Sequence, residues 1–208
     1  LRYALGGWPE PFGIGMVMDG FAWISAALTV AIALPVGVAA LSRNRYPSIF
    51  FFFLLLLVAG MISVALTGDL FTMFVSFEIV AIAAYVLIAF DRTTEGLVAS
   101  FKYLMLSSVG ILFFLFGVFL VYRAVGVLSI GAVSGAIRAT PAVGDLPAIH
   151  LAIAAICVGI GVRTAFVPFH TWLPEAHAYA PTPISALLSG ALIKVSIFAM
   201  MRILRAFS

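Results

Sequence analysis

Charged residues are scarce in this sequence of 208 residues. They make up only 9% of the chain, as 11 basic and 8 acidic residues, whereas a soluble domain carries roughly 25%. So few charges cannot cover the water-exposed surface of a chain of this size. The composition therefore excludes an ordinary soluble domain and predicts that most of the surface faces hydrocarbon.

Cysteine is almost absent as well. The single cysteine, Cys157, lies in an apolar run, which excludes an intramolecular disulfide and any cluster of several cysteines. A basic patch with interleaved aromatic residues is also missing, so we expect no nucleic-acid partner. The sequence contains no flavin, quinone or iron–sulfur motif, and we expect no cofactor and no redox chemistry on this chain.

What the sequence has instead is a series of long apolar segments. A membrane-spanning helix needs about 20 mainly apolar residues, and five segments reach that length, at 21–41, 48–66, 70–90, 101–122 and 184–204. The connection at 123–147 contains apolar stretches that favour a helix at the membrane interface. These segments predict an all-α, polytopic membrane protein with one membrane domain over residues 1–208.

A sixth apolar segment, at 148–165, is short for a span and reaches Arg163 near its end. It is followed by a broken segment at 166–182 that contains three prolines, with Pro183 directly after it. Prolines at this density cannot all lie inside one regular helix. We therefore expect about six transmembrane helices, the fifth of which is interrupted.

Basic residues lie on both sides of the predicted spans. The connections after the first and third spans carry Arg43, Arg45, Arg92 and Lys102, and the positive-inside rule places these residues in the cytoplasm. Four other arginines would then lie on the opposite side of the membrane, which the positive-inside rule does not favour: Arg123, Arg138, Arg202 and Arg205. The charges leave the orientation undecided.

Three charged residues, Glu78, Arg163 and Lys194, lie within or at the inner edge of predicted spans. At a rise of 1.5 Å per residue, Glu78 is about 12 Å and Lys194 about 15 Å into its helix, near the middle of a core roughly 30 Å thick. A charge at that depth costs about 2.5–3.5 kcal/mol. Two interpretations stay open: an ion or proton path, or a static Glu78–Arg163 pair with Lys194 snorkelling or capped by carbonyl groups.

A second polar group, His170, Glu175 and His177, lies in the broken segment. Histidine gains and loses a proton near neutrality, so these histidines suit a proton relay. Pro174 disrupts the helical spacing that would order three metal ligands, and we expect no metal site. Lys102, near the start of a span, is interpreted as a snorkelling base at the interface. Because transporters place ion sites where helices are broken, the break after Arg163 is the main functional feature.

Two sequence motifs resemble a known family. Residues 162–194, VRTAFVPFHTWLPEAHAYAPTPISALLSGALIK, resemble the signature of the antiporter-like proton-channel subunits, found in Mrp sodium/proton antiporters, complex I and membrane-bound hydrogenases. Residues 68–78, GDLFTMFVSFE, are similar to the family's glutamate helix, and residues 101–103 to the start of the next helix. Residues 7–13 also resemble the loop before the family's third helix.

The resemblance implies an architecture and partners. The six spans would be helices three to eight of about fourteen, holding the first of two inverted half-channels, so the chain is expected to be a fragment or a split subunit. The implied partners are other membrane subunits, the lipid bilayer, protons and, as a second candidate, sodium ions. The implied location is a prokaryotic cytoplasmic membrane.

The resemblance also implies roles for single residues. Glu78 would be the buried glutamate, Lys194 the basic residue of the eighth helix and His170 a relay near the break, with His177 and Lys102 on the same proton path. Many family members have lysine where this chain has Arg163. Arginine stays protonated, so Arg163 would be either a fixed charge whose pairing with Glu78 switches or the mark of an inactive half-channel.

Three functions therefore stay open. The first is proton or proton/sodium translocation in an antiporter. The second is proton translocation as part of a redox-driven pump, such as an NADH:quinone oxidoreductase-like or hydrogenase complex. The third is a structural membrane protein with static buried ion pairs.

Overall fold

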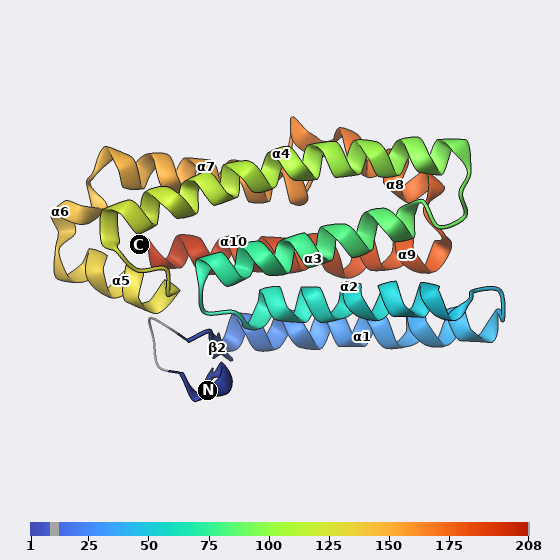
Figure 1. Ribbon diagram of the computed structural model, residues 1–208, viewed down its shortest axis with the longest axis horizontal. Helices are drawn as coiled ribbons and strands as arrows, with labels where there is room; N and C mark the ends of the chain where they lie inside the picture. The colour runs from blue at the N-terminus through green and yellow to red at the C-terminus, as the bar shows by residue number, and fades with distance from the viewer. Residues whose placement is uncertain (9–12, 208) are drawn as a thin grey trace.

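A computed structural model describes residues 1–8 and 13–207. Residues 9–12 of the predicted loop motif lie outside the described part. Four long helices follow one another in antiparallel order (Figure 1): α1 (Gly20–Ser42), α2 (Ser48–Leu66), α3 (Leu70–Ile88) and α4 (Thr94–Val125). Short connections place each helix beside the previous one, as the apolar segments predict.

The fifth predicted span is interrupted, and this prediction is confirmed. Helix α7 (Pro147–Arg163) ends at the arginine, and the chain then forms a short 3₁₀ helix, η2 (Phe169–Thr171), and helix α8 (Trp172–Tyr179). The last span consists of α9 (Thr182–Leu187), a π-helical segment η3 (Leu188–Leu192) and α10 (Ile193–Ala206).

By length and hydropathy, five helices of the described chain can cross a membrane: α1 to α4 and the last span, Thr182–Ala206. Helix α7 is apolar but has only 17 residues. The six predicted spans therefore correspond to five full-length helices and one shorter one. The fold class, an all-α polytopic membrane protein, is confirmed.

The boundaries of α4 differ from the prediction. The helix begins at Thr94, whereas the apolar segment predicts a start at residue 101. Thr93 caps the helix, because its hydroxyl oxygen accepts a hydrogen bond from the Gly96 amide at 3.1 Å, and such caps satisfy amides that have no partner within the helix. The polar residues before the apolar segment therefore belong to the helix. Asp19 and Asp69 cap α1 and α3 in the same way.

Small elements gather at the end of the bundle that holds both termini (Figure 1). A hairpin of β1 (Arg2–Ala4) and β2 (Gly15–Val17) encloses the 3₁₀ turn η1 (Leu5–Gly7), and α5 (Ile130–Ala139) and α6 (Pro141–Gly144) lie in the connection before α7. Two bridges tie this end to the bundle, from Met16 to Thr67 and from Asp69 to Ser129. The sequence predicts a helix in the connection but not the hairpin.

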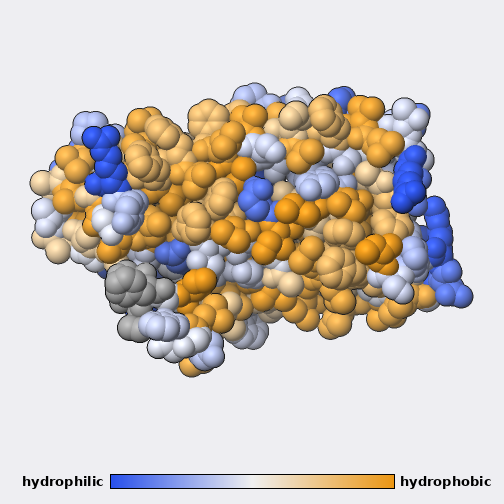
Figure 2. All heavy atoms as spheres, viewed as in Figure 1, coloured by the Kyte–Doolittle hydropathy of each residue, from blue (hydrophilic) through white to orange (hydrophobic). Residues whose placement is uncertain are grey.

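The surface agrees with a membrane location. Figure 2 shows apolar residues over most of this face of the molecule, with hydrophilic residues at both ends and a smaller hydrophilic group near the middle. Leu34, Leu55 and Leu112 each expose 64% of their surface. Because large apolar side chains line the outside of several helices, the bundle has the surface that hydrocarbon solvates.

Glycines allow α4 and α7 to approach closely. A Cβ atom at Gly159 of α7 would lie 2.6 Å from the carbonyl oxygen of Gly110 and 2.8 Å from the amide nitrogen of Phe114, both on α4. A Cβ atom at Gly117 of α4 would likewise lie 2.7 Å from the Ala152 carbonyl oxygen of α7. Small residues at such contacts let helix backbones pack tightly within membranes, and this packing fixes the end of α7 where Arg163 lies.

We predict that Gly159→Ala destabilises the protein by about 1–3 kcal/mol, the usual cost of overpacking. The added methyl group would meet the backbone of α4, which cannot move away as a side chain can. The measurement is the midpoint of thermal unfolding in detergent. Gly37→Ala in α1 is the matched control, since nothing lies within 4 Å of its added methyl group. Equal midpoints for both variants would contradict the prediction.

Candidate functional site

The break after α7 is stabilised by specific hydrogen bonds. The Thr164 hydroxyl donates to the carbonyl oxygens of Ile160 at 3.0 Å and Gly161 at 3.2 Å, and the Trp172 indole Nε1 donates to the Val162 carbonyl at 2.9 Å. The last carbonyl groups of a helix need partners of this kind, so α7 ends in a defined geometry with Arg163 as its last residue.

Arg163 lies inside the bundle and forms an ion pair with Glu78 of α3. Its Nη2 atom is 3.7 Å from the Glu78 Oε1 atom, and the two side chains are 1% and 40% exposed. The guanidinium also lies over the ring of Phe77, 4.8 Å from the ring centroid, which is a favourable cation–π contact. The expected proximity of Glu78 and Arg163 is therefore confirmed. Glu78, which the family resemblance implies to be buried, is a partly exposed carboxylate that faces a buried cation.

The surroundings of Arg163 contain further buried polar atoms. Its Nε, Nη1 and Nη2 atoms have no hydrogen-bond partner within the described protein, and neither have the hydroxyl groups of Tyr103 and Ser107 on α4. Tyr103 interacts electrostatically with both Arg163 and Glu78, and its ring packs against Trp172 with centroids 4.8 Å apart. Buried polar groups are nearly always hydrogen bonded to protein or water, so this is a polar site suited to water.

Lys102 and Glu175 form a second ion pair, between α4 and α8. The lysine Nζ atom lies 2.6 Å from the Glu175 Oε1 atom, and the side chains are 48% and 37% exposed. The sequence predicts a snorkelling base for Lys102, and the family resemblance adds a place on the proton path, but neither predicts its partner. The structure gives it an anionic partner as well, and the pair ties the broken segment to α4.

His177 and Lys194 belong to a third polar group, around the last span. The His177 ring nitrogen Nδ1 lies 2.9 Å from the Ser185 hydroxyl of α9, and Lys194 interacts electrostatically with His177. The Lys194 Nζ atom donates to the Ser189 carbonyl oxygen within η3. A π-helical turn interrupts the regular hydrogen-bond pattern and is frequent at functional sites, and here one of its carbonyl groups holds the lysine.

His170 stands apart from these three groups. It lies in η2, is exposed, and takes part in no hydrogen bond or ion pair with the described residues. Within the described part of the chain, no three His, Cys, Asp or Glu side chains lie close enough together to hold a metal ion.

Sequence reasoning missed the roles of Tyr103, Ser107 and Ser185. Tyr103 is part of residues 101–103, FKY, which resemble the start of a helix in the family. Nothing in the chain spacing indicates that its ring lies beside Trp172, because the two residues are on different helices and meet only through packing.

Fold and site together define a polytopic α-helical membrane protein with ionisable residues inside its bundle. The model of the family described as NADH:quinone oxidoreductase/Mrp antiporter, transmembrane, matches residues 67–208. This match includes Glu78, Arg163 and Lys194 and covers more than half of the chain. The chain belongs to this family.

Known relatives agree with this assignment. The chain is 36% identical over 212 residues to NADH-quinone oxidoreductase subunit N of Desulforudis audaxviator (strain MP104C), covering 98% of this chain and 41% of the relative. It is 32% identical over 203 residues to the D-type subunit of the Na(+)/H(+) antiporter of Bacillus subtilis (strain 168), covering 96% of this chain and 41% of that protein.

Among solved structures, a chain of the membrane-bound sulfane sulfur reductase, an archaeal respiratory membrane complex, matches with a TM-score of 0.85 and 33% identity. The match covers 99% of this chain and 42% of that one. The chain thus spans about two fifths of the length of these relatives.

We predict an asymmetry between the two partners of the buried pair. Glu78→Gln should lower the free energy of unfolding by about 2 kcal/mol or more, because it leaves a buried cation without its counter-ion. Arg163→Met should cost less, since it leaves only a half-exposed carboxylate. Glu175→Gln, in the exposed Lys102 pair, should stay within about 1 kcal/mol of the parent protein. The measurement is unfolding of the purified protein in detergent. A loss for Arg163→Met equal to or greater than that for Glu78→Gln would contradict the prediction, and so would equal losses for Glu78→Gln and Glu175→Gln.

Proposed function

We propose that this chain moves protons through a half-channel in a multisubunit membrane complex. The observation that carries the proposal is the Glu78–Arg163 pair, in which a fully charged guanidinium is buried in a membrane bundle directly before a helix break. Ionisable residues inside membrane bundles mark ion or proton pathways. Broken helices at membrane depth are tolerated where they are packed in protein or line a wet cavity.

The two members of this pair have different roles. Arg163 keeps its proton under ordinary conditions, so it acts as a fixed positive charge and does not carry protons itself. The Glu78 side chain is 40% exposed, and we assign it the proton-carrying role in the pair. The buried hydroxyl groups of Tyr103 and Ser107, with the Arg163 guanidinium, provide the polar surroundings in which water can connect Glu78 to the interior.

The proposed path continues toward the last span. The Lys102–Glu175 pair lies on the α8 side of α4, and His177 contacts Ser185 while interacting electrostatically with Lys194. Each group lies on an element next to the break, but no direct hydrogen bond joins the three groups among the described residues. Proton transfer between them therefore requires bridging water or side-chain rearrangement. His170, exposed in η2, is assigned as a relay near the break.

The relatives indicate the setting in which this path operates. They are named as subunits of an NADH-quinone oxidoreductase and of a sodium/proton antiporter, and the structural match belongs to a respiratory membrane complex. By analogy, this chain works with other membrane subunits in a prokaryotic cytoplasmic membrane. Protons are the transported ion, and sodium is the second candidate for exchange. Redox chemistry, where the complex performs it, belongs to other subunits.

One contact favours the rival function, a static structural role. Lys194 donates to a carbonyl oxygen of its own helix, at Ser189, which is how a lysine with a purely structural role would be capped. The position of His177, whose Nδ1 atom lies 2.9 Å from the Ser185 hydroxyl beside the last span, supports transport instead, because histidine is the side chain best suited to pass protons near neutral pH. Substitution of Lys194 separates the two functions.

We predict that Lys194→Met abolishes transport in the assembled complex and leaves assembly intact. Lys194→Arg should also impair transport, because arginine holds its proton too tightly to pass it on. The measurement is the formation of a pH or sodium gradient in membrane vesicles, normalised to the amount of assembled complex.

The static function predicts a different pattern for the same two variants. Arginine would replace the lysine well, and methionine would mainly reduce the yield of assembled complex. Full transport by both variants would remove Lys194 from the path. Near-normal transport by the arginine variant alone would overturn the proposed role of Lys194 in favour of a static charge.

A further inference from the structure

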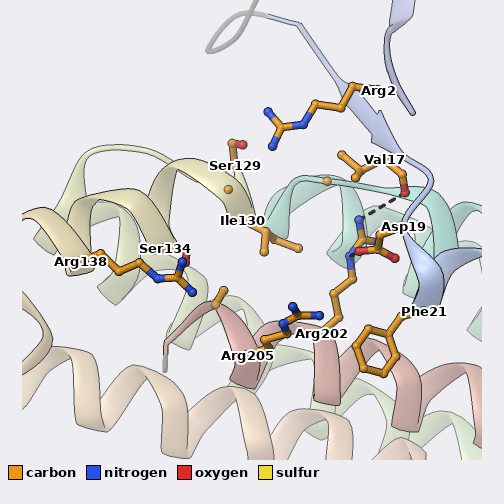
Figure 3. A pocket seen from close by; sticks show the side chains of 13 residues that line it. Arg2, Val17, Asp19, Phe21, Ser129, Ile130, Ser134, Arg138, Arg202 and Arg205 are labelled. Atoms are coloured by element: carbon orange, nitrogen blue, oxygen red, sulfur yellow. Dashed lines mark hydrogen bonds and ion pairs between the residues drawn. The ribbon is translucent and has the colours of Figure 1, made fainter.

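A cavity of about 330 Å³ opens at the end of the bundle that holds the termini (Figure 3). The hairpin, the start of α1, helix α5 and the end of α10 contribute its lining. Four arginines contribute to that lining, from segments far apart in the chain: Arg2, Arg138, Arg202 and Arg205. In Figure 3 their side chains surround the same space.

The positive charge of this arginine cavity exceeds the negative charge of its lining. Asp19 is its only acidic lining residue among those described, and it is already engaged, 3.2 Å from the Arg202 Nε atom and bound to the Ala22 amide at 2.8 Å. Arg2 and Arg138 make no ion pair or hydrogen bond with described residues. Like charges held together repel one another, so the cavity favours an anion.

Arg202 has a structural role in the cavity, because it is already bonded to neighbouring elements. It is buried, and its Nη1 and Nη2 atoms donate to the carbonyl oxygens of Ala65 at 2.8 Å and Val17 at 3.3 Å. Through these bonds it joins α10 to the end of α2 and to the hairpin. Arg202 therefore holds the elements in place, while Arg2 and Arg138 remain available to a ligand.

The chemistry of the lining selects the class of anion. Arginine presents a planar set of donors that matches phosphate oxygens and binds them in pairs. Ser129 and Ser134 add hydroxyl groups, and Phe21 and Ile130 add apolar surface. The cavity lies at the end of the bundle, beside the end of the last apolar helix at Ala206. Arginines at the ends of membrane spans are placed to meet lipid headgroups, whose phosphate esters are anionic.

We propose that this arginine cavity binds a phosphate group, with Arg2 and Arg138 as the ligand-binding arginines. An anionic phospholipid headgroup is the source that its position and apolar lining fit best, and free phosphate shares the same chemistry. A bound phosphate would also offset the excess of arginines on the side of the membrane opposite Arg43 and Arg92.

The test is native mass spectrometry of the purified complex that contains this chain. The complex is titrated with phosphatidylglycerol, with neutral phosphatidylcholine, and with inorganic phosphate alone. Arg2→Gln/Arg138→Gln removes both ligand-binding arginines. The control, Arg43→Gln/Arg123→Gln, removes the same charge from two arginines outside the cavity lining. Each arginine near an anionic lipid headgroup contributes about fivefold to the affinity. Removal of two arginines should therefore weaken phosphatidylglycerol binding roughly 25-fold in the cavity variant, whereas the control variant should bind this lipid as the parent does.

The three ligands distinguish the sources of phosphate. Preference for phosphatidylglycerol over both other ligands, lost in the cavity variant alone, identifies a lipid site. If millimolar inorganic phosphate displaces the lipid from the parent complex, and the cavity variant no longer binds phosphate, the cavity is a site for free phosphate. Unchanged binding of both anionic ligands by the cavity variant overturns the proposal, provided that both variants elute as intact complexes in size-exclusion chromatography.

Discussion

The buried guanidinium of Arg163 is the constraint on which the rest of this bundle depends. A charge that cannot be neutralised is costly at membrane depth, and three helices combine to hold it. Helix α3 supplies the Glu78 carboxylate and the Phe77 ring, and α7 carries the arginine at its last turn. Helix α4 adds the buried hydroxyl groups of Tyr103 and Ser107, which make no direct hydrogen bond to the guanidinium. The glycine contacts between α4 and α7 bring the backbones of these two helices close together.

The broken segment begins directly after this arginine, where α7 ends. The chain turns away, and the Trp172 indole and the Thr164 hydroxyl satisfy the carbonyl groups that the break exposes. The π-helical turn before Lys194 repeats this solution in the last span, since a carbonyl group there binds the lysine. Both irregular sites thus place a cation beside backbone or side-chain oxygens.

The sequence predicts much of this fold because the bilayer imposes a length and a composition on each span. The uncharged segment 48–66 is a helix with those bounds, and the cost of isolated charges is enough to predict that Glu78 and Arg163 meet. The predicted start of α4 is wrong, because a polar first turn capped by Thr93 carries no apolar signal. The Lys102–Glu175 pair and the arginine cavity could not be predicted, since their residues are brought together only by the tertiary fold.

Arginine rather than lysine at position 163, at the end of α7, limits which side chains of the site can release a proton. A lysine at that position could release its proton and leave a neutral interior, whereas Arg163 keeps its charge in every state. The Glu78 carboxylate is the counter-ion of that constant charge. In the proposed function, any rearrangement of Glu78 must therefore be coupled to movement of Arg163 toward other oxygens, such as those of Tyr103 and Ser107. Arg163 then sets the electrostatic field along the proposed path without carrying protons itself.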